Sequence, residues 1–501
     1  MTLGLMFFPA PEALAPAAQR LIAVTFLMAV LWFTQLVPVA VTSLLPLALY
    51  PILGIGSAQA TAAPYADRNV FLFLGGFLIA LGLERSGLHR RLALMLVSRL
   101  GSSPAGLVFG FMLTTACLSM WISNSAATML MIPIALALLK TLQESGAAGE
   151  FDDITRRLEV PTLLGIAYGA STGGFATLVG TPTNVAFRGF WEQRFAAEGL
   201  GEVSAADWIL AFLPASLLML LGCGLLLTWS LPRESALTRL GKEFFQRRLH
   251  ELGPWQPAER IVAAVFGLTA FLWLTRVPLQ FDELELLPGW TTTLRDWGQG
   301  LNQDWSYLPT MVDDATIAML MGTLLFLLPG AVTPDGKATP ILDWKFAELH
   351  IPWGMLILIG CGFSIAAAFE RTGLSAWLGQ LIAAALTGQS PLGLIIGVCT
   401  CVSFLTEFTT NVATLNMLLP VLAGVAVELG VDPLLILLPA TISASCAYMM
   451  PVATPPNAIA FGTGRVPMLT MVRYGLVMNL IGVVVITCLT RYWIPLVFTA
   501  D

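Results

Sequence analysis

A short polar motif occurs twice inside long apolar stretches, and it constrains the fold more than any other feature of the chain. The first copy reads SNSAATMLMIP from Ser123 to Pro133, and the second reads TNVATLNMLLP from Thr410 to Pro420. In each copy a hydroxyl residue precedes an asparagine, and a proline follows that asparagine nine residues later. Polar side chains in hydrocarbon are costly unless they are paired or face a cavity. Two copies in corresponding places predict a binding site at the junction of an internal repeat.

The composition places the chain in a membrane. Of its 501 residues, 56% are hydrophobic and only 11% are charged, whereas soluble domains carry about 25% charged residues. The seven cysteines and three histidines lack the spacing of a zinc site or a disulfide framework. The chain has no arm rich in lysine and arginine that would suggest binding to nucleic acid. We therefore expect an all-α polytopic membrane protein.

Apolar segments long enough to span a bilayer, about 20 residues each, predict ten spans. Two further apolar regions, about 104–141 and 389–427, are interrupted by the polar motif and predict re-entrant hairpins that enter and leave by the same face. The expected spans lie at about 19–37, 40–56, 69–83, 159–180, 208–231, 258–277, 314–330, 353–370, 434–452 and 469–495.

The two halves match beyond the motif. GGFLIALGLERSGL at Gly75–Leu88 resembles GCGFSIAAAFERTGL at Gly360–Leu374, and GTPTN at Gly180–Asn184 resembles ATPPN at Ala453–Asn457. Three correspondences in the same order indicate a duplication. Five spans per repeat is an odd number, so the second copy enters the membrane upside down. We expect one inverted repeat over residues 1–245, with a broken helix near 180–184, and a second over 246–501, with a broken helix near 453–457.

The residue types at the hairpin tips suit an anion and a monovalent cation. A helix that begins after Asn124 or Asn411 points unpaired N–H groups at the break, which favours an anion such as a carboxylate. Ser125 adds a hydroxyl in the first copy, whereas Val412 offers none in the second. The same breaks expose neutral hydroxyl, amide and carbonyl oxygens, which suit sodium. The Thr-Pro-x-Asn segments are expected to supply further carbonyls, because proline frees a carbonyl one turn back.

At these residues the chain resembles the divalent-anion:sodium symporter family, which includes the animal citrate and dicarboxylate carriers and their bacterial relatives. The family's Ser-Asn-Thr motifs read Ser123-Asn124-Ser125 and Thr410-Asn411-Val412 here, and SASCAYMMPVATPPNAIAFGTGRV at Ser443–Val466 is close to the family signature. The resemblance covers the chain after about residue 18. Compared with the usual family member, we expect the first span to be missing, and Val412 replaces the second threonine.

The resemblance implies a homodimer in which a fixed scaffold domain carries a moving transport domain, an elevator mechanism. It also implies two sodium sites and a substrate site between them. The first sodium site would comprise Ser119, Ser123, Asn124 and Gly180; the second would comprise Thr406, Thr409, Asn411 and Ala453; and the substrate would meet Asn124, Ser125, Asn411, Val412 and Pro455.

The sequence therefore predicts a sodium-coupled symporter of succinate, malate or fumarate, with citrate also open, in the inner membrane of a bacterium. Sodium is the coupling ion, and no enzymatic cofactor is expected. A sodium-independent dicarboxylate exchanger and a sodium-coupled sulfate transporter are alternatives on the same fold. An enzyme is disfavoured, because Glu407 is the one acidic residue near the motif and no histidine accompanies it. The sequence leaves open the preferred substrate, the number of coupled sodium ions, the resting conformation and the role of the 278–313 insertion.

Overall fold

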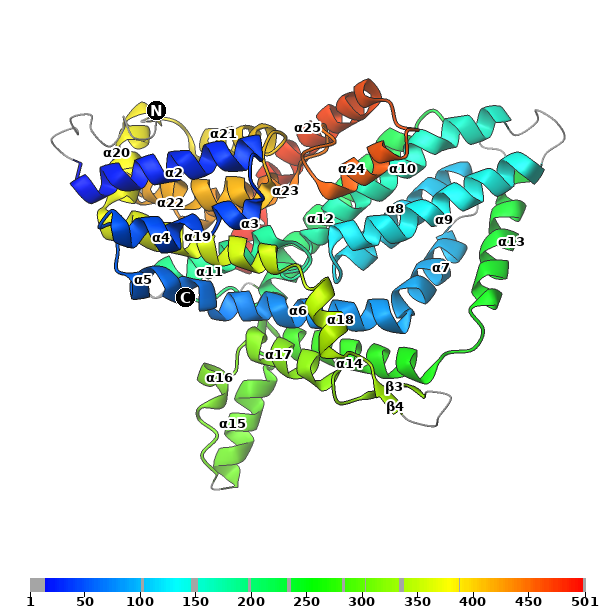
Figure 1. The fold of residues 1–501 in the computed structure, drawn as a ribbon, viewed down its shortest axis with the longest axis horizontal. Helices are drawn as coiled ribbons and strands as arrows, with labels where there is room; N and C mark the ends of the chain where they lie inside the picture. The colour runs from blue at the N-terminus through cyan, green and yellow to red at the C-terminus, as the bar shows by residue number, and fades with distance from the viewer. Residues whose placement is uncertain are drawn as a thin grey trace.

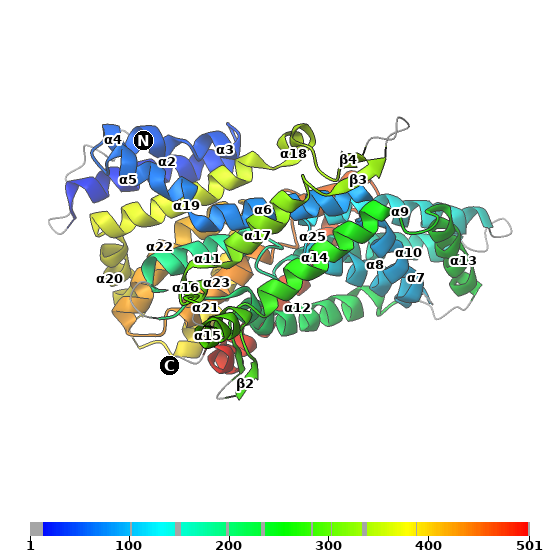
Figure 2. The ribbon, with the colours of Figure 1, turned by 90° about the horizontal axis from the view of Figure 1, so that it is seen from below.

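The helices of the protein run mainly along its long axis (Figure 1). Helix α13 crosses one end of this bundle, and α15 projects away from it. Figure 2 shows the same arrangement from below, with α14 and α17 side by side on the near face. The computed structural model describes residues 14–100, 103–145, 152–196, 200–231, 236–281, 284–301, 303–332, 338–386 and 388–498.

The first half of the chain forms α2 (Pro16–Thr34), α3 (Val39–Thr42), α4 (Leu45–Ile52), α5 (Ala58–Ala62), the 3-10 helix η1 (Ala63–Ala66), α6 (Arg68–Ser86), α7 (Leu88–Leu100), α8 (Pro104–Ser119), α9 (Asn124–Ser145), α10 (Asp152–Gly174), α11 (Pro182–Arg194) and α12 (Ala205–Thr228).

The second half forms α13 (Ala236–Glu251), α14 (Pro257–Leu274), α15 (Trp290–Gly300), α16 (Leu308–Met311), α17 (Asp314–Leu324), α18 (Trp344–His350), α19 (Trp353–Thr372), α20 (Leu374–Leu386), α21 (Pro391–Leu405), α22 (Asn411–Leu429), α23 (Leu434–Ser445), α24 (Pro455–Gly462), α25 (Met468–Tyr492) and α26 (Ile494–Val497). Two antiparallel strand pairs accompany the helices: β1 (Leu279–Phe281) with β2 (Leu284–Leu287), and β3 (Pro329–Val332) with β4 (Ala338–Pro340).

Eight helices in the described parts of the chain are long and apolar enough to cross a membrane, or nine if the bent pair α20 and α21 counts as one span. Six of them overlap expected spans, and two are the second arms of the expected hairpins. This confirms a helical, multi-pass membrane protein. The eight helices are Pro16–Thr34, Ala58–Ser86, Asn124–Gln143, Ala205–Thr228, Pro257–Leu274, Trp353–Thr372, Asn411–Leu429 and Met468–Tyr492.

Three of the expected spans are corrected, because they do not form continuous helices of spanning length. The segment 40–56 is divided between α3 and α4, 314–330 gives an α17 that ends at Leu324, and 434–452 gives an α23 that ends at Ser445. A hydropathy average cannot register such breaks, since the residues remain apolar through them. The expected span 159–180 overlaps the end of the long α10, which stops at Gly174 before the first Thr-Pro-x-Asn motif.

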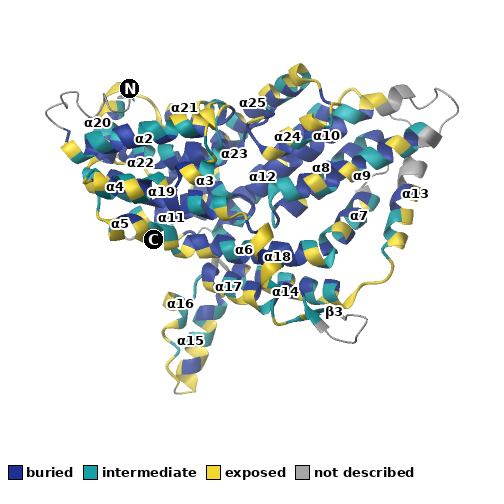
Figure 3. Ribbon diagram, viewed as in Figure 1, coloured by how far each residue is buried: buried dark blue, intermediate teal, exposed yellow. Residues whose placement is uncertain are grey.

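The two expected hairpins are pairs of helices that meet at the polar motifs. Helices α8 and α9 meet at 120–123, and α21 and α22 meet at 406–410. Helix α8 packs closely on α10, because Gly173 lies against the backbone of Ala116, where a Cβ would clash. Figure 3 shows that the middle of the bundle is buried, whereas α15 and α16 carry many exposed residues. The expected boundary between residues 245 and 246 lies within α13.

Candidate functional site

The first hairpin tip holds its asparagine in a fixed orientation. The Ser119 hydroxyl, at the end of α8, donates to Asn124 Oδ1 at 2.6 Å. Asn124 is the first residue of α9, and the Ser123 hydroxyl accepts from the Ala126 amide at 3.2 Å, as an N-cap does. The Asn124 side chain also lies against Gly174, where a Cβ would occupy its place. The tip and the end of α10 therefore meet at Asn124.

The first helix break lies between α10 and α11 and faces this tip. Gly180 donates its amide to the Thr177 hydroxyl at 3.1 Å, and it lies against the carbonyl groups of Gly174 and Ser119. The Asn184 side-chain amide donates to Thr177 O at 2.7 Å and lies 3.4 Å from Gly174 O. The break thus gathers several carbonyl oxygens beside the tip, and Asn184 fixes their positions.

The second hairpin tip repeats the hydroxyl–asparagine contact. The Thr406 hydroxyl lies 2.9 Å from Asn411 Oδ1 and 2.9 Å from Ala444 O, so it joins the tip to the end of α23. Asn411 is the first residue of α22. The Thr409 hydroxyl is paired with the Thr414 hydroxyl, on the first turn of that helix.

The second helix break, between α23 and α24, also repeats the first. The Asn457 side-chain amide donates to Ala447 O and to Met450 O, both at 3.1 Å. These acceptors precede Asn457 by ten and seven residues, the same separations as Gly174 and Thr177 from Asn184. Ala453 takes the place of Gly180, and its amide donates to Met450 O at 3.2 Å.

Glu407 distinguishes the second tip from the first. Its carboxylate accepts hydrogen bonds from the backbone amides of Tyr448, Met449 and Met450 at 2.8–3.1 Å, and from Asn479 Nδ2 at 2.7 Å. The position that corresponds in the first copy is Met120, which offers only its backbone carbonyl to the Thr177 hydroxyl. Glu407 therefore ties the second hairpin to the second break.

The structure brings together only part of the predicted set. Ser119, Asn124 and Gly180 share one cluster, and Thr406 and Asn411 share another, whereas no hydrogen bond joins Ala453 to the second tip. The predicted substrate residues have unequal surroundings: Ser125 is half-buried, Pro455 is exposed, and Val412 is buried in an apolar cluster with residues of α2 and α19. Sequence reasoning missed Gly174 and Thr177, which carry no motif of their own, and Thr414, which lies in the second polar motif but was given no role. It expected the Thr-Pro-x-Asn asparagines to mark the breaks but did not predict that they bind carbonyls.

The donor set fits a small monovalent cation. Neutral hydroxyl, amide and carbonyl oxygens surround both tips, and two buried oxygens near the second tip, Thr410 Oγ1 and Asn457 Oδ1, have no hydrogen-bond partner. A buried polar atom without a partner is costly, and coordination of a cation would compensate it. Sodium accepts such oxygens without needing a carboxylate ligand.

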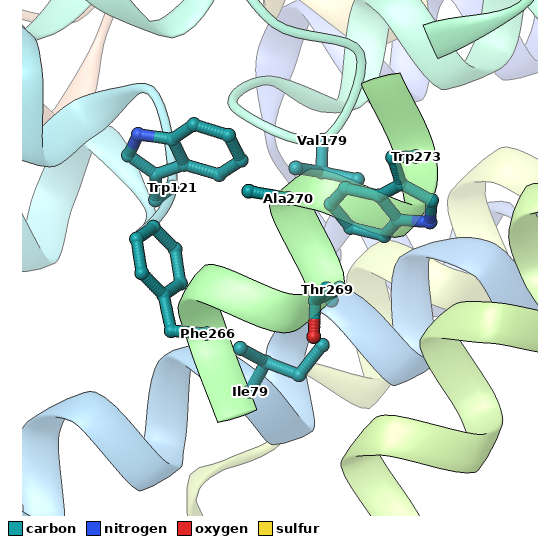
Figure 4. A pocket seen from close by; sticks show the side chains of 8 residues that line it. Ile79, Trp121, Val179, Phe266, Thr269, Ala270 and Trp273 are labelled. Atoms are coloured by element: carbon teal, nitrogen blue, oxygen red, sulfur yellow. The ribbon is translucent and has the colours of Figure 1, made fainter. Parts of the chain in front are cut away.

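A small apolar pocket lies beside the first tip (Figure 4), with a cavity volume of about 10 Å³. Trp121 and Val179 line it from the tip and the break, and Ile79 of α6 and Phe266 and Trp273 of α14 line it from the other side. The Trp121 and Phe266 rings meet edge to face, 4.9 Å between centroids. Because its lining carries no charged side chain, this pocket does not suit a dianion; it is a gap in the packing between the tip and its neighbours.

Membrane-spanning helices, two hairpin tips and two broken helices with exposed carbonyls define a membrane transporter of the broken-helix class. The chain belongs to the sodium:sulfate symporter family, since the family model described as the sodium:sulfate symporter transmembrane region matches residues 1–499. This confirms the resemblance inferred from the motifs. The protein is therefore an integral membrane transporter and not an enzyme.

Two curated relatives are similar over nearly the whole chain. The sodium-dependent dicarboxylate transporter SdcS of Staphylococcus saprophyticus is 37% identical over 497 residues, which cover 98% of this chain and 89% of the relative. The protein of the same name from Staphylococcus aureus strain USA300 is 37% identical over 505 residues, which cover 100% of this chain and 90% of the relative. Both relatives are bacterial.

Two solved structures share the fold. The YdaH transporter of Alcanivorax borkumensis has a TM-score of 0.57 and 16% identity, and the match covers 95% of this chain and 98% of that one. Neisseria gonorrhoeae MtrF, described with a class of antimetabolite efflux pumps, has a TM-score of 0.58 and 15% identity. The match covers 98% of this chain and 97% of that one. At this identity the likeness concerns the fold alone.

Proposed function

We propose that the protein is a sodium-coupled symporter of small dicarboxylates such as succinate, malate and fumarate. One observation carries the proposal: each hairpin tip holds a hydroxyl–asparagine pair, Ser119–Asn124 and Thr406–Asn411, against the carbonyls of a broken helix. The names of the two staphylococcal relatives support the same substrate class.

The proposed sodium sites use the oxygens at each tip. Ser119, Ser123, Asn124 and Gly180 would provide the first site, and Thr406, Thr409, Asn411 and Ala453 would provide the second. Gly180 allows the backbone to approach the tip, because a side chain there would collide with carbonyls. Each sodium ion carries one positive charge. A membrane potential of 100 mV therefore contributes about 2.3 kcal/mol for each positive charge by which the bound sodium ions exceed the negative charge of the substrate.

The substrate is proposed to lie between the two tips. The N-termini of α9 and α22 would each attract one carboxylate. The amides of Asn124 and Asn411 would contact the carboxylates, with Ser125 at one end and Val412 and Pro455 at the other. Because Ser125 can donate a hydrogen bond and Val412 cannot, the two carboxylates would be bound unequally.

The two halves, 1–245 and 246–501, are proposed to be inverted repeats that form a homodimeric elevator. The matching hydrogen bonds of Asn184 and Asn457 support a duplication, because their acceptors precede them by the same numbers of residues. In this proposal the hairpins and broken helices move together as the transport domain, and α6, α14 and α17 belong to the scaffold.

Uptake by the purified protein in liposomes tests the proposal. Labelled succinate is expected to accumulate under an inward sodium gradient and not under an equal potassium gradient. Equal uptake in both would contradict sodium coupling and favour an exchanger. Unlabelled malate, citrate and sulfate serve as competitors. Sulfate is the specific alternative, because the matching family model is named for it; competition by sulfate and not by malate would assign that substrate instead.

A further inference from the structure

A buried cluster of charged residues links the first helix break to helices that carry none of the predicted site residues. Arg188 lies on α11, four residues after Asn184, and its Nη1 is 2.9 Å from Asp314 Oδ2 at the start of α17. The side chains of Arg188 and Asp314 are 2% and 0% exposed. Asp314 Oδ1 also accepts from Arg276 Nε at 2.6 Å, just beyond the end of α14.

One side of this cluster is attached to the first break. Asn184 ties the start of α11 to the carbonyls at the end of α10. Helix α12 is attached to the same break, because Trp208 Nε1 donates to Phe175 O at 3.0 Å. The Ala205 amide at the start of α12 donates to Asp314 Oδ2 at 3.3 Å. Asp314 therefore binds both helices that follow the break.

The other side is a separate packed unit made of α6, α14 and α17. Helices α6 and α17 are in backbone contact, since a Cβ on Gly75 would lie 2.5 Å from the carbonyl carbon of Ala318. Trp273 Nε1 of α14 donates to Asp314 O at 3.0 Å. The apolar pocket of Figure 4 lies between this unit and the first tip, so packing between the two sides is incomplete there.

Each side of the cluster holds its own buried pair of opposite charges. On α11, Arg188 Nε is 2.9 Å from Glu192 Oε1, one turn away, while on the other side Arg276 neutralises Asp314. Removal of one partner from a buried ion pair leaves a charge without compensation, which is strongly unfavourable. Here the two sides can separate while every one of these four charges keeps its partner.

From this arrangement we infer that Arg188–Glu192 and Asp314–Arg276 form a charge joint that dissociates and re-forms as the first break moves past α17 during transport. The inference rests on the proposed transport cycle and adds to it the contact that holds the present conformation. Arg68 of α6 supports the joint, since its Nε is 3.1 Å from Glu192 and its Nη1 is 3.7 Å from Asp313, so it too keeps a partner after separation. Helix α19 lies on the α6 side of the joint, since its Ser364 hydroxyl donates to Thr61 O of α5, just before α6, at 3.1 Å. Next to the joint, Gly189 lets α11 lie flat on the Phe363 ring of α19.

Cross-linking across the joint tests the inference. The pair Gly189→Cys/Phe363→Cys joins α11 to α19, and the control pair Gly82→Cys/Leu325→Cys joins α6 to α17, where Gly82 packs on the Leu325 side chain. Each pair is compared with its single-cysteine parents and treated with a short thiol-specific cross-linker in liposomes. The first cross-link is expected to abolish uptake reversibly on reduction, and the control cross-link to leave it unchanged. Full uptake with α11 tied to α19 would overturn the inference.

Neutralisation of the joint gives the second measurement. The variant Arg188→Gln/Glu192→Gln removes one neutral pair and leaves Asp314 with Arg276, so no buried charge is left alone. It is expected to slow cross-linking at 189 and 363 by about fivefold or more, while cross-linking at 82 and 325 is unchanged and shows that the fold is intact. The matched control Arg248→Gln/Glu251→Gln removes an exposed ion pair of α13 and should change neither rate.

If the neutralised variant cross-links at 189 and 363 as fast as the parent, the inference of a charge joint is contradicted, even if uptake falls. If Gly189→Cys/Phe363→Cys fails to fold, Asp67→Cys/Gln193→Cys replaces it, since Gln193 Nε2 lies 3.1 Å from Asp67 Oδ2 across the same boundary. Absence of sodium-dependent uptake in the parent protein would contradict the proposed function. The effect of neutralisation on the cross-linking rates would still show whether the charge joint holds α11 in its present position.

Discussion

The Asn184 side chain donates a hydrogen bond of 2.7 Å to the carbonyl of Thr177, seven residues earlier in the chain. Asn457 makes the equivalent bond to Met450 at 3.1 Å. A helix break leaves carbonyls without intrahelical partners, and in both halves the asparagine that follows the proline fixes some of them. The remaining carbonyl oxygens are thereby held in place, as the proposed cation sites require. The Thr-Pro-x-Asn motif thus interrupts a helix and fixes the conformation of the interrupted backbone.

Replacement of either asparagine by alanine should therefore weaken sodium binding. Asn184→Ala and Asn457→Ala each leave buried carbonyls unpaired, which costs about 1–3 kcal/mol. We expect a lower thermal midpoint and a higher sodium concentration for half-maximal uptake. Asn416→Ala is the matched control, because it removes a buried amide bond of 3.1 Å to Leu358 O, outside the breaks. An equal change of sodium dependence in all three variants would contradict the role of the breaks.

The hydroxyl residues before the tips should govern stabilisation by sodium. A ligand at 100 times its dissociation constant stabilises the folded state by about 2.7 kcal/mol. Sodium is therefore expected to raise the thermal midpoint of the parent protein relative to potassium, and this rise should shrink in Ser119→Ala and again in Thr406→Val. Thr115→Ala, which removes a buried hydroxyl bond one turn earlier on α8, should keep the full rise. A full sodium-dependent rise in the double variant Ser119→Ala/Thr406→Val would show that the cation binds elsewhere.

Glu407 should contribute to stability rather than to proton chemistry. In Glu407→Gln, an amide group replaces one oxygen that faces backbone N–H donors, and the charge that strengthens those bonds is lost. Hydrogen bonds to charged groups contribute about 1.5–3 kcal/mol, so we expect a loss of about 2 kcal/mol in the free energy of unfolding. Chemical unfolding in detergent measures it, with the exposed Glu428→Gln as control. A variant as stable as the parent would refute the ordering role.

Local motifs allowed the positions of the helix breaks to be predicted, because each break is encoded by adjacent residues. Ser123-Asn124 and Thr410-Asn411 begin helices where the sequence predicted, and hydropathy located most of the long helices. Gly174 and Thr177 could not be predicted, since their role depends on α10 meeting the hairpin tip in space. The cluster of Arg188, Asp314 and Arg276 was missed for the same reason: its members are widely separated in sequence and come together only through packing.

The difference between Ser125 and Val412 should determine substrate choice. Ser125 is half-buried and has a hydroxyl, whereas Val412 is 4% exposed within an apolar cluster. Ser125→Ala should weaken succinate uptake, since a hydrogen bond to a charged group contributes about 1.5–3 kcal/mol, or roughly tenfold or more in the Michaelis constant. Val412→Thr adds a hydroxyl that must find a partner, and we expect it to alter competition by citrate and sulfate more than uptake of succinate. The measurement is inhibition of labelled succinate uptake by each competitor. Identical inhibition profiles for the parent and both variants would place substrate selection away from the hairpin tips.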